Sequence, residues 1–129
     1  MQLKDATLLR QKCYIDGAWV DADSGATIKV TNPVDSGAIG TIPKLGTAET
    51  RRAIEAANKA YPAWRAKTAK DRAGILRKWY ELMLQHKEDL ARIMTAEQGK
   101  PLSESRGEVI YGRPSSSGSP RKASASMAT

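Results

Sequence analysis

The amino-acid pattern of this 129-residue chain changes abruptly at Tyr111, and this change limits what the chain can fold into. Up to Tyr111, apolar and polar side chains alternate with the periods of strands and helices. The rest, GRPSSSGSPRKASASMAT, has six serines, no acidic or aromatic residue, and one large apolar side chain, Met127. We therefore expect a structured segment over residues 1–111 and a disordered, Ser/Pro-rich basic tail over 112–129.

The charge of the chain does not favour a nucleic-acid partner. The formal net charge is +7, and the tail supplies +3 of it through Arg113, Arg121 and Lys122. The first 111 residues are only mildly basic, and their Lys and Arg alternate with Asp and Glu. A nucleic-acid-binding protein clusters its basic residues on one face or along one element. We therefore expect no nucleic-acid partner.

The single cysteine and the lack of long apolar runs predict a cytoplasmic protein with no membrane partner. Cys13 stands alone, so no intrachain disulfide can form, which fits a reducing compartment. The first residues, MQLKDATLLRQKCYIDG, have no apolar run of signal-peptide length. No stretch approaches the roughly 20 apolar residues of a membrane span.

The first 43 residues predict a short amphipathic helix over residues 3–12 and then a small β meander. Asp16-Gly17 between apolar runs is a tight-turn signal, and Asp-Ser-Gly follows at 23–25 and again at 35–37. Residues 27–31 alternate with period two, as a half-buried strand does. Prolines end this strand and the next one, because proline cannot donate to a β ladder.

From Thr47 the apolar period becomes helical. Thr47 is expected to cap a first helix with Glu49 in its first turn, and Pro62 to end or kink that helix. Thr68 and Asp71 resemble a capping box.

A long second helix is expected from this box to about Met94, and a short third helix from Ser103. The second helix carries one wide apolar stripe, made of Ile75, Leu76, Trp79, Leu82, Met83, Leu90 and Ile93.

Together these patterns predict an α/β chain, α+β as it stands, in which two to three helices follow small β elements. Hairpins are marginally stable alone in water, so the helical stripes have to pack mostly on one another. We interpret the chain as a piece of a larger α/β protein.

Two side chains with reactive chemistry are better explained as structural residues. Cys13 has no activating group nearby in sequence, since the only histidine, His86, lies far along the chain. We expect Cys13 to be structural and His86 to be a solvated residue on the polar side of the long helix. A lone histidine does not make a metal site.

Two short patterns have functional alternatives. Gln98-Gly99-Lys100 has a faint similarity to a phosphate loop, but the earlier glycine is missing and Pro101 replaces Ser or Thr. A helix C-cap explains it better. Residues 65–80 are basic and amphipathic, as in helices that bind calmodulin or membrane surfaces. We favour a charged solvent face over a core stripe, because Asp71 interrupts the basic face.

Three blocks of the chain, in this order, resemble the amino-terminal part of the aldehyde dehydrogenase superfamily. They are the NP…G…IG…P block at residues 32–43, the AW-R-…-R…L-R block at 63–77 and the EQGKP…E…GE block at 97–108. The similarity covers Leu8 to Tyr111 without a gap. It is greatest to NAD(P)-dependent succinate-semialdehyde dehydrogenases.

The resemblance implies oxidation of a small aldehyde, succinate semialdehyde to succinate, with NAD or NADP as cofactor. In the superfamily a cysteine thiolate attacks the aldehyde, hydride passes to nicotinamide, and a glutamate-activated water releases the acid. All these residues, and the dinucleotide-binding ones, lie downstream of the matched region. We therefore predict no catalytic, cofactor-binding or metal residue here.

The same resemblance predicts an incomplete Rossmann-like cofactor domain. It further predicts that the chain alone binds no cofactor and is inactive. The resemblance also implies that full-length family members are homo-oligomers.

The abrupt change after Tyr111 leads to a reading-frame hypothesis. One base added after the first base of the Gly112 codon, with suitable synonymous codons, gives YAASFIEWFAEEGERIYGD, which is similar to the family's continuation. The alternative to a changed frame is a natural, disordered Ser/Pro-rich tail. The alternative to an enzyme fragment is a stand-alone helical interaction module with a basic disordered tail. That module predicts a cooperative melt and salt-sensitive binding.

Overall fold

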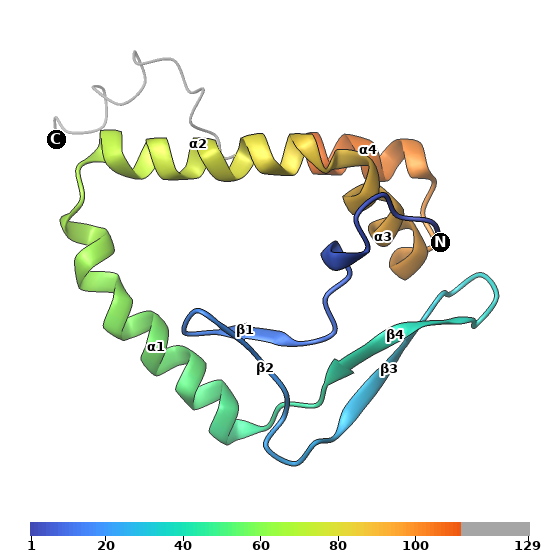
Figure 1. The fold of residues 1–129 in the computed structure, drawn as a ribbon, viewed down its shortest axis with the longest axis horizontal. Coiled ribbons are helices and arrows are strands. Elements are labelled where there is room, and N and C mark those ends of the chain that lie inside the picture. The colour runs from blue at the N-terminus through green and yellow to red at the C-terminus, as the bar shows by residue number, and fades with distance from the viewer. Residues whose placement is uncertain (112–129) are drawn as a thin grey trace, which may run out of the picture.

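The computed structural model describes residues 1–111 of the chain. The expected disordered tail at 112–129 lies outside the described residues. Within them, one 3-10 turn and four short strands precede four helices (Figure 1). The mixed α/β class, with small β elements first, is confirmed.

The strands form two separate antiparallel hairpins instead of the expected single meander. β1 (Cys13–Ile15) pairs with β2 (Ala18–Val20), and β3 (Thr27–Thr31) pairs with β4 (Ala38–Pro43). A tight turn divides the two hairpins, since the N–H of Gly25 donates to the carbonyl oxygen of Ala22 at 2.8 Å.

The turn inside the first hairpin follows the sequence signal closely. Asp16 and Gly17 link the paired residues Ile15 and Ala18, and their φ angles are 49° and 81°. Two consecutive positive φ angles match the twist of a two-residue hairpin, which is why Asp-Gly is favoured there.

The amino-terminal segment is not the expected amphipathic helix over residues 3–12. It forms only a 3-10 turn, η1 (Ala6–Leu8), which the carboxylate of Asp5 caps by accepting from the N–H of Thr7 at 2.9 Å. The N–H groups of Lys4 and Asp5 donate to the two carboxylate oxygens of Asp89 at 3.0 and 2.8 Å. These bonds attach the segment to a distant helix.

Residues 1–111 contain four helices, where two to three were expected: α1 (Thr47–Ala66), α2 (Ala69–Gln85), α3 (Lys87–Gln98) and α4 (Leu102–Tyr111). The expected long helix is divided at His86, whose φ of −101° and ψ of 15° depart from helical geometry. Thr68 caps α2 as predicted, since its hydroxyl oxygen accepts from the N–H of Asp71 at 3.2 Å. Pro62 lies inside α1 without ending it.

The core within residues 1–111 is small. α3 packs on α4, and α2 contacts both, while α1 rests on β1 (Figure 1). Within residues 1–111, the buried residues with apolar side chains are Ala22, Pro43, Ala91 and Val109. Ser105 is fully buried between α3 and α4, where its hydroxyl is 2.8 Å from that of Thr95.

The apolar stripe predicted for the long helix is only partly covered on α2. Leu76, Tyr80 and Met83 are half-buried. Ile75, Trp79 and Leu82 remain 45%, 61% and 55% exposed. The described residues therefore cover only one side of this helix.

Candidate functional site

Cys13 and His86 lie on separate elements. Cys13 is half-buried in β1, opposite Val20. His86 is half-buried at the α2–α3 junction, not on a solvated polar face as expected. Its N–H donates to Leu82 at 3.1 Å and its carbonyl accepts from Leu90 at 3.0 Å, so its backbone joins the two helices. Among the described residues, no group of His, Cys, Asp and Glu could hold a metal ion.

The Gln98-Gly99-Lys100 pattern is a helix C-cap, as the sequence favoured. Gly99 has a φ of 70°, and its N–H donates to the carbonyl of Thr95 at 2.9 Å. A Cβ at this glycine would lie 2.8 Å from the ring of Pro33. Lys100 forms an ion pair with Glu108. The Lys100 ammonium, which a phosphate loop would use to bind phosphate, is therefore paired with a carboxylate.

The basic segment at residues 65–80 is not one continuous helix. It contains the end of α1, the non-helical Lys67 and Thr68, and most of α2. A calmodulin- or membrane-binding helix would need one uninterrupted apolar face. No helix of the described chain is long and apolar enough to cross a membrane.

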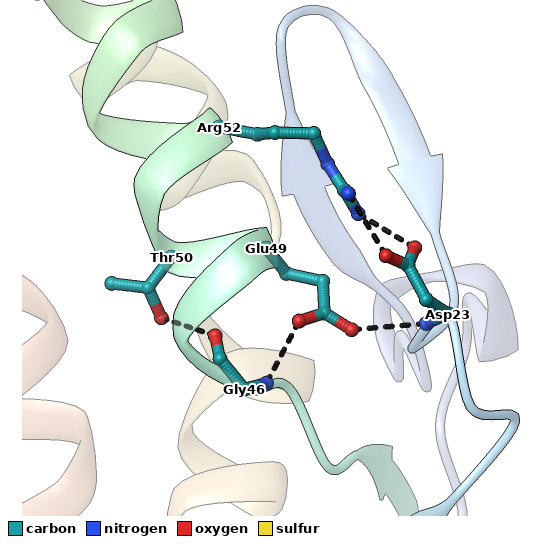
Figure 2. Close-up of polar contacts among 5 residues, drawn as sticks. All are labelled: Asp23, Gly46, Glu49, Thr50 and Arg52. Carbon is teal, nitrogen blue, oxygen red and sulfur yellow. Dashed lines mark hydrogen bonds and ion pairs between the residues drawn. The ribbon is translucent and has the colours of Figure 1, made fainter.

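The most connected polar cluster joins the start of α1 to the turn after β2 (Figure 2). The carboxylate of Glu49 accepts from the N–H of Asp23 and from that of Gly46, both at 3.0 Å. The cap of α1 is thus Gly46, one residue earlier than predicted, because Glu49 reaches back from the third helical position. Arg52 donates from both terminal nitrogens to the Asp23 carboxylate, at 2.8 and 2.6 Å.

This arrangement favours the ionised carboxylates. The N–H groups of Glu49 itself, Asp23 and Gly46 hold the pKa of Glu49 below its usual value. Hydrogen bonding by Arg52 lowers the pKa of Asp23. Each charge already has its partner, so the cluster holds one element against another and offers no free acid or base.

Two further carboxylates tie distant elements together. Asp89 is 4% exposed, and its bonds to the N–H groups of Lys4 and Asp5 lower its pKa. Glu88 of α3 pairs with Arg106 of α4 in a two-bonded contact, at 2.9 and 2.8 Å. The hydrogen bonds from Arg106 lower the pKa of Glu88.

A pocket of about 430 Å³ lies beside this Glu49–Asp23–Arg52 cluster. Its lining includes the paired Asp23 and Arg52, with Asp21, Glu55 and Lys59 around them. The lining contains no cysteine, histidine, serine or threonine. A nucleophile with an adjacent base is therefore not provided there.

Residues 1–111 do not contain a parallel sheet of the kind at which dinucleotides bind. Such cofactors bind at the carboxyl ends of parallel strands, where a helix N-terminus faces the phosphates. Both sheets of the described chain are antiparallel hairpins. These residues therefore provide no strand-end crevice of that kind.

Comparison with known proteins places these observations in a family. The model of the aldehyde dehydrogenase family matches residues 19–114. The chain is 67% identical over 111 residues to glutarate-semialdehyde dehydrogenase of Pseudomonas putida, covering 86% of this chain and 23% of that protein. It is 57% identical to an NADP-specific succinate-semialdehyde dehydrogenase of Escherichia coli, with the same two coverages.

A solved aldehyde dehydrogenase of Brucella melitensis biovar abortus superposes with a TM-score of 0.85 at 55% identity, over 88% of this chain and 23% of that one. The chain belongs to the aldehyde dehydrogenase family. It spans about a quarter of the length of the curated relatives that it matches.

Proposed function

We propose that this chain is the amino-terminal scaffold segment of an NAD(P)-dependent enzyme that oxidises succinate semialdehyde to succinate. The observation that carries the proposal is the 67% identity to a glutarate-semialdehyde dehydrogenase, together with 57% to a succinate-semialdehyde dehydrogenase. Both names describe a short aldehyde with a carboxylate at its other end. The proposed substrate class is therefore a semialdehyde. The test compares succinate semialdehyde with glutarate semialdehyde, whose carbon chain is longer.

The role of residues 1–111 in such an enzyme is to support elements that the segment itself lacks. Its polar clusters are internally paired, and its one cysteine is half-buried in a hairpin. We propose that the 129-residue chain alone neither binds the dinucleotide nor oxidises an aldehyde. Cytoplasmic localisation and homo-oligomeric assembly of the complete enzyme remain predictions.

The substrate test uses the gene with one base restored after the first base of the Gly112 codon. We propose that this base reopens a frame encoding the remainder of the enzyme, and sequencing of the genomic segment checks it. The restored protein is then assayed with succinate semialdehyde, glutarate semialdehyde and acetaldehyde, each with NAD and with NADP. We expect the highest kcat/KM for succinate semialdehyde.

Four results would contradict the proposal. A continuous native frame with no dehydrogenase sequence downstream would contradict the proposal that this chain is part of a dehydrogenase. A preference for acetaldehyde would contradict a semialdehyde as the substrate class. A preference for glutarate semialdehyde would contradict succinate semialdehyde as the substrate and favour the longer carbon chain. Cofactor-dependent turnover by the purified 129-residue chain would show that this segment does not need the remainder.

A further inference from the structure

The two longest helices expose large apolar side chains along one side. On α2, Ile75, Trp79 and Leu82 follow one another at intervals of four and three residues and therefore share a face. Their exposed fractions of 45–61% are high for an isoleucine, a tryptophan and a leucine that lie next to one another on one helix face. We call these three residues the open face of α2.

The described residues cover the neighbouring edge of the same apolar stripe. Leu76, Tyr80 and Met83 are half-buried there, and α2 contacts α3 and α4. Each of them follows an open-face residue by one position, which is about 100° around a helix of 3.6 residues per turn. The two sets therefore form one wide apolar stripe, of which only one edge is packed within residues 1–111.

α1 repeats the pattern with a different division of residues. Small side chains, including Ala53 and Ala56, line a pocket together with Tyr14 and Ile15 of β1, where the helix meets the hairpin. Its larger side chains, Ile54 and Tyr61, are 64% and 54% exposed. Two large side chains of α1 are thus mostly exposed in residues 1–111, whereas Trp64 is half-buried.

The solved relative carries this fold as part of a much longer chain. The present chain covers only 23% of it. About three-quarters of such a protein therefore lies outside the part that this chain matches and is available to cover the open face.

We propose that the open face of α2 is a docking surface for the remaining three-quarters of an aldehyde dehydrogenase, even when that part is a separate polypeptide. The two chains then assemble non-covalently into one enzyme. This inference rests on the proposed function, because it takes the partner from the same family. It goes further in assigning a defined surface that holds the partner without a peptide bond.

The test co-expresses the full 129-residue chain, carrying an affinity tag, with a defined partner. The partner is the Pseudomonas putida glutarate-semialdehyde dehydrogenase from which the aligned amino-terminal segment has been removed. We expect recovery of both chains at equal amounts and a shift of tryptophan emission to shorter wavelength as Trp79 loses contact with water. Semialdehyde oxidation by the pair is a second readout.

Substitutions on the open face separate docking from folding. Trp79→Glu and Leu82→Glu replace exposed side chains, so the helical circular dichroism of the chain alone should not change. Each should lower recovery of the partner roughly ten-fold or more, as loss of a central interface residue does. Gln85→Glu is the matched control, because it adds the same charge at an exposed position of α2 and should leave recovery unchanged.

Several results would overturn the inference. Recovery that is insensitive to both open-face substitutions would place the contact elsewhere. A dimer of the 129-residue chain that Trp79→Glu dissociates would make a second copy the occupant. The relative's own amino-terminal segment, supplied separately, is the positive control. No recovery with this chain, whether that control binds or not, would exclude docking of a separate partner.

These outcomes are distinct from failure of the proposed function. If the base-restored protein oxidises semialdehydes while the separate chains do not associate, only the docking inference fails. If the chains associate but the restored protein oxidises no semialdehyde, the proposed function fails and the docking surface stands.

Discussion

Replacing Trp79 with alanine should destabilise the 129-residue chain far less than a tryptophan substitution in a folded core. Trp79 is 61% exposed, so only about two-fifths of its surface has contacts to lose. A buried tryptophan costs about 3–5 kcal/mol when truncated to alanine. Scaling this range by the covered part gives about 1–2 kcal/mol of unfolding free energy. In a longer protein that covers the face, the loss should reach the full range.

Urea unfolding followed by far-ultraviolet circular dichroism measures this loss by linear extrapolation. Val109→Ala is the comparison, because Val109 is only 4% exposed and loses two buried methyl groups, worth roughly 1.5 kcal/mol at about 0.8 kcal/mol each. The two variants should therefore be similar, although tryptophan is much the larger side chain. A loss of about 3 kcal/mol or more for Trp79→Ala would refute the reasoning, since it would mean that the open face is already covered.

Three other substitutions test local features. Gly99→Ala should lower the free energy of unfolding in urea by more than about 1 kcal/mol, because φ is 70° and the new carbon would lie 2.8 Å from the Pro33 ring. If the same substitution costs less in a Pro33→Ala background, the difference is the share due to this contact. Ser105→Leu should strongly reduce the thermal stability of the fully buried α3–α4 contact, whereas Ser103→Leu, at an exposed position, should leave melting unchanged. Glu49 has a lowered pKa in the folded chain, so its contribution is complete above the usual glutamate pKa and is lost as pH falls through the folded value. An acid titration of helical circular dichroism should be shallower for Glu49→Gln, and an unchanged profile would mean that the Glu49 bonds are not made.

Local sequence signals predicted the features that depend on a few neighbouring residues. Asp16-Gly17 forms the two-residue turn, Thr68 caps its helix, and Gly99 ends α3 with a positive φ. Each signal describes a backbone conformation that its own residues favour, so no distant contact is needed. The three family blocks were likewise sufficient to indicate the aldehyde dehydrogenase family.

The features that sequence reasoning missed depend on residues far apart in the chain. Asp89 bonds to the N–H of Lys4 across 85 positions, which replaces the expected amino-terminal helix. Glu49 reaches Asp23 across 26 positions and moves the cap to Gly46. The capping-box spacing from Gly46 to Glu49 could have shown the cap, but no sequence signal indicated the bond from Lys4 to Asp89 or the bond from Asp23 to Glu49. The division of the long helix at His86 also follows from packing, as α3 turns to meet α4.

The hairpin arrangement also affects how this chain behaves at high concentration. Each strand in residues 1–111 has a bonded neighbouring strand on one side only, so its other side is an edge. On the edge of β4, the N–H of Thr41 donates to the side-chain oxygen of Gln11 at 2.9 Å. In the second hairpin, Lys29 and the terminal Pro43 discourage pairing with another molecule, as charges and prolines do on natural edges. The first hairpin, Cys-Tyr-Ile and Ala-Trp-Val, has neither within its strands. We therefore expect strand-to-strand association between molecules to begin at the first hairpin.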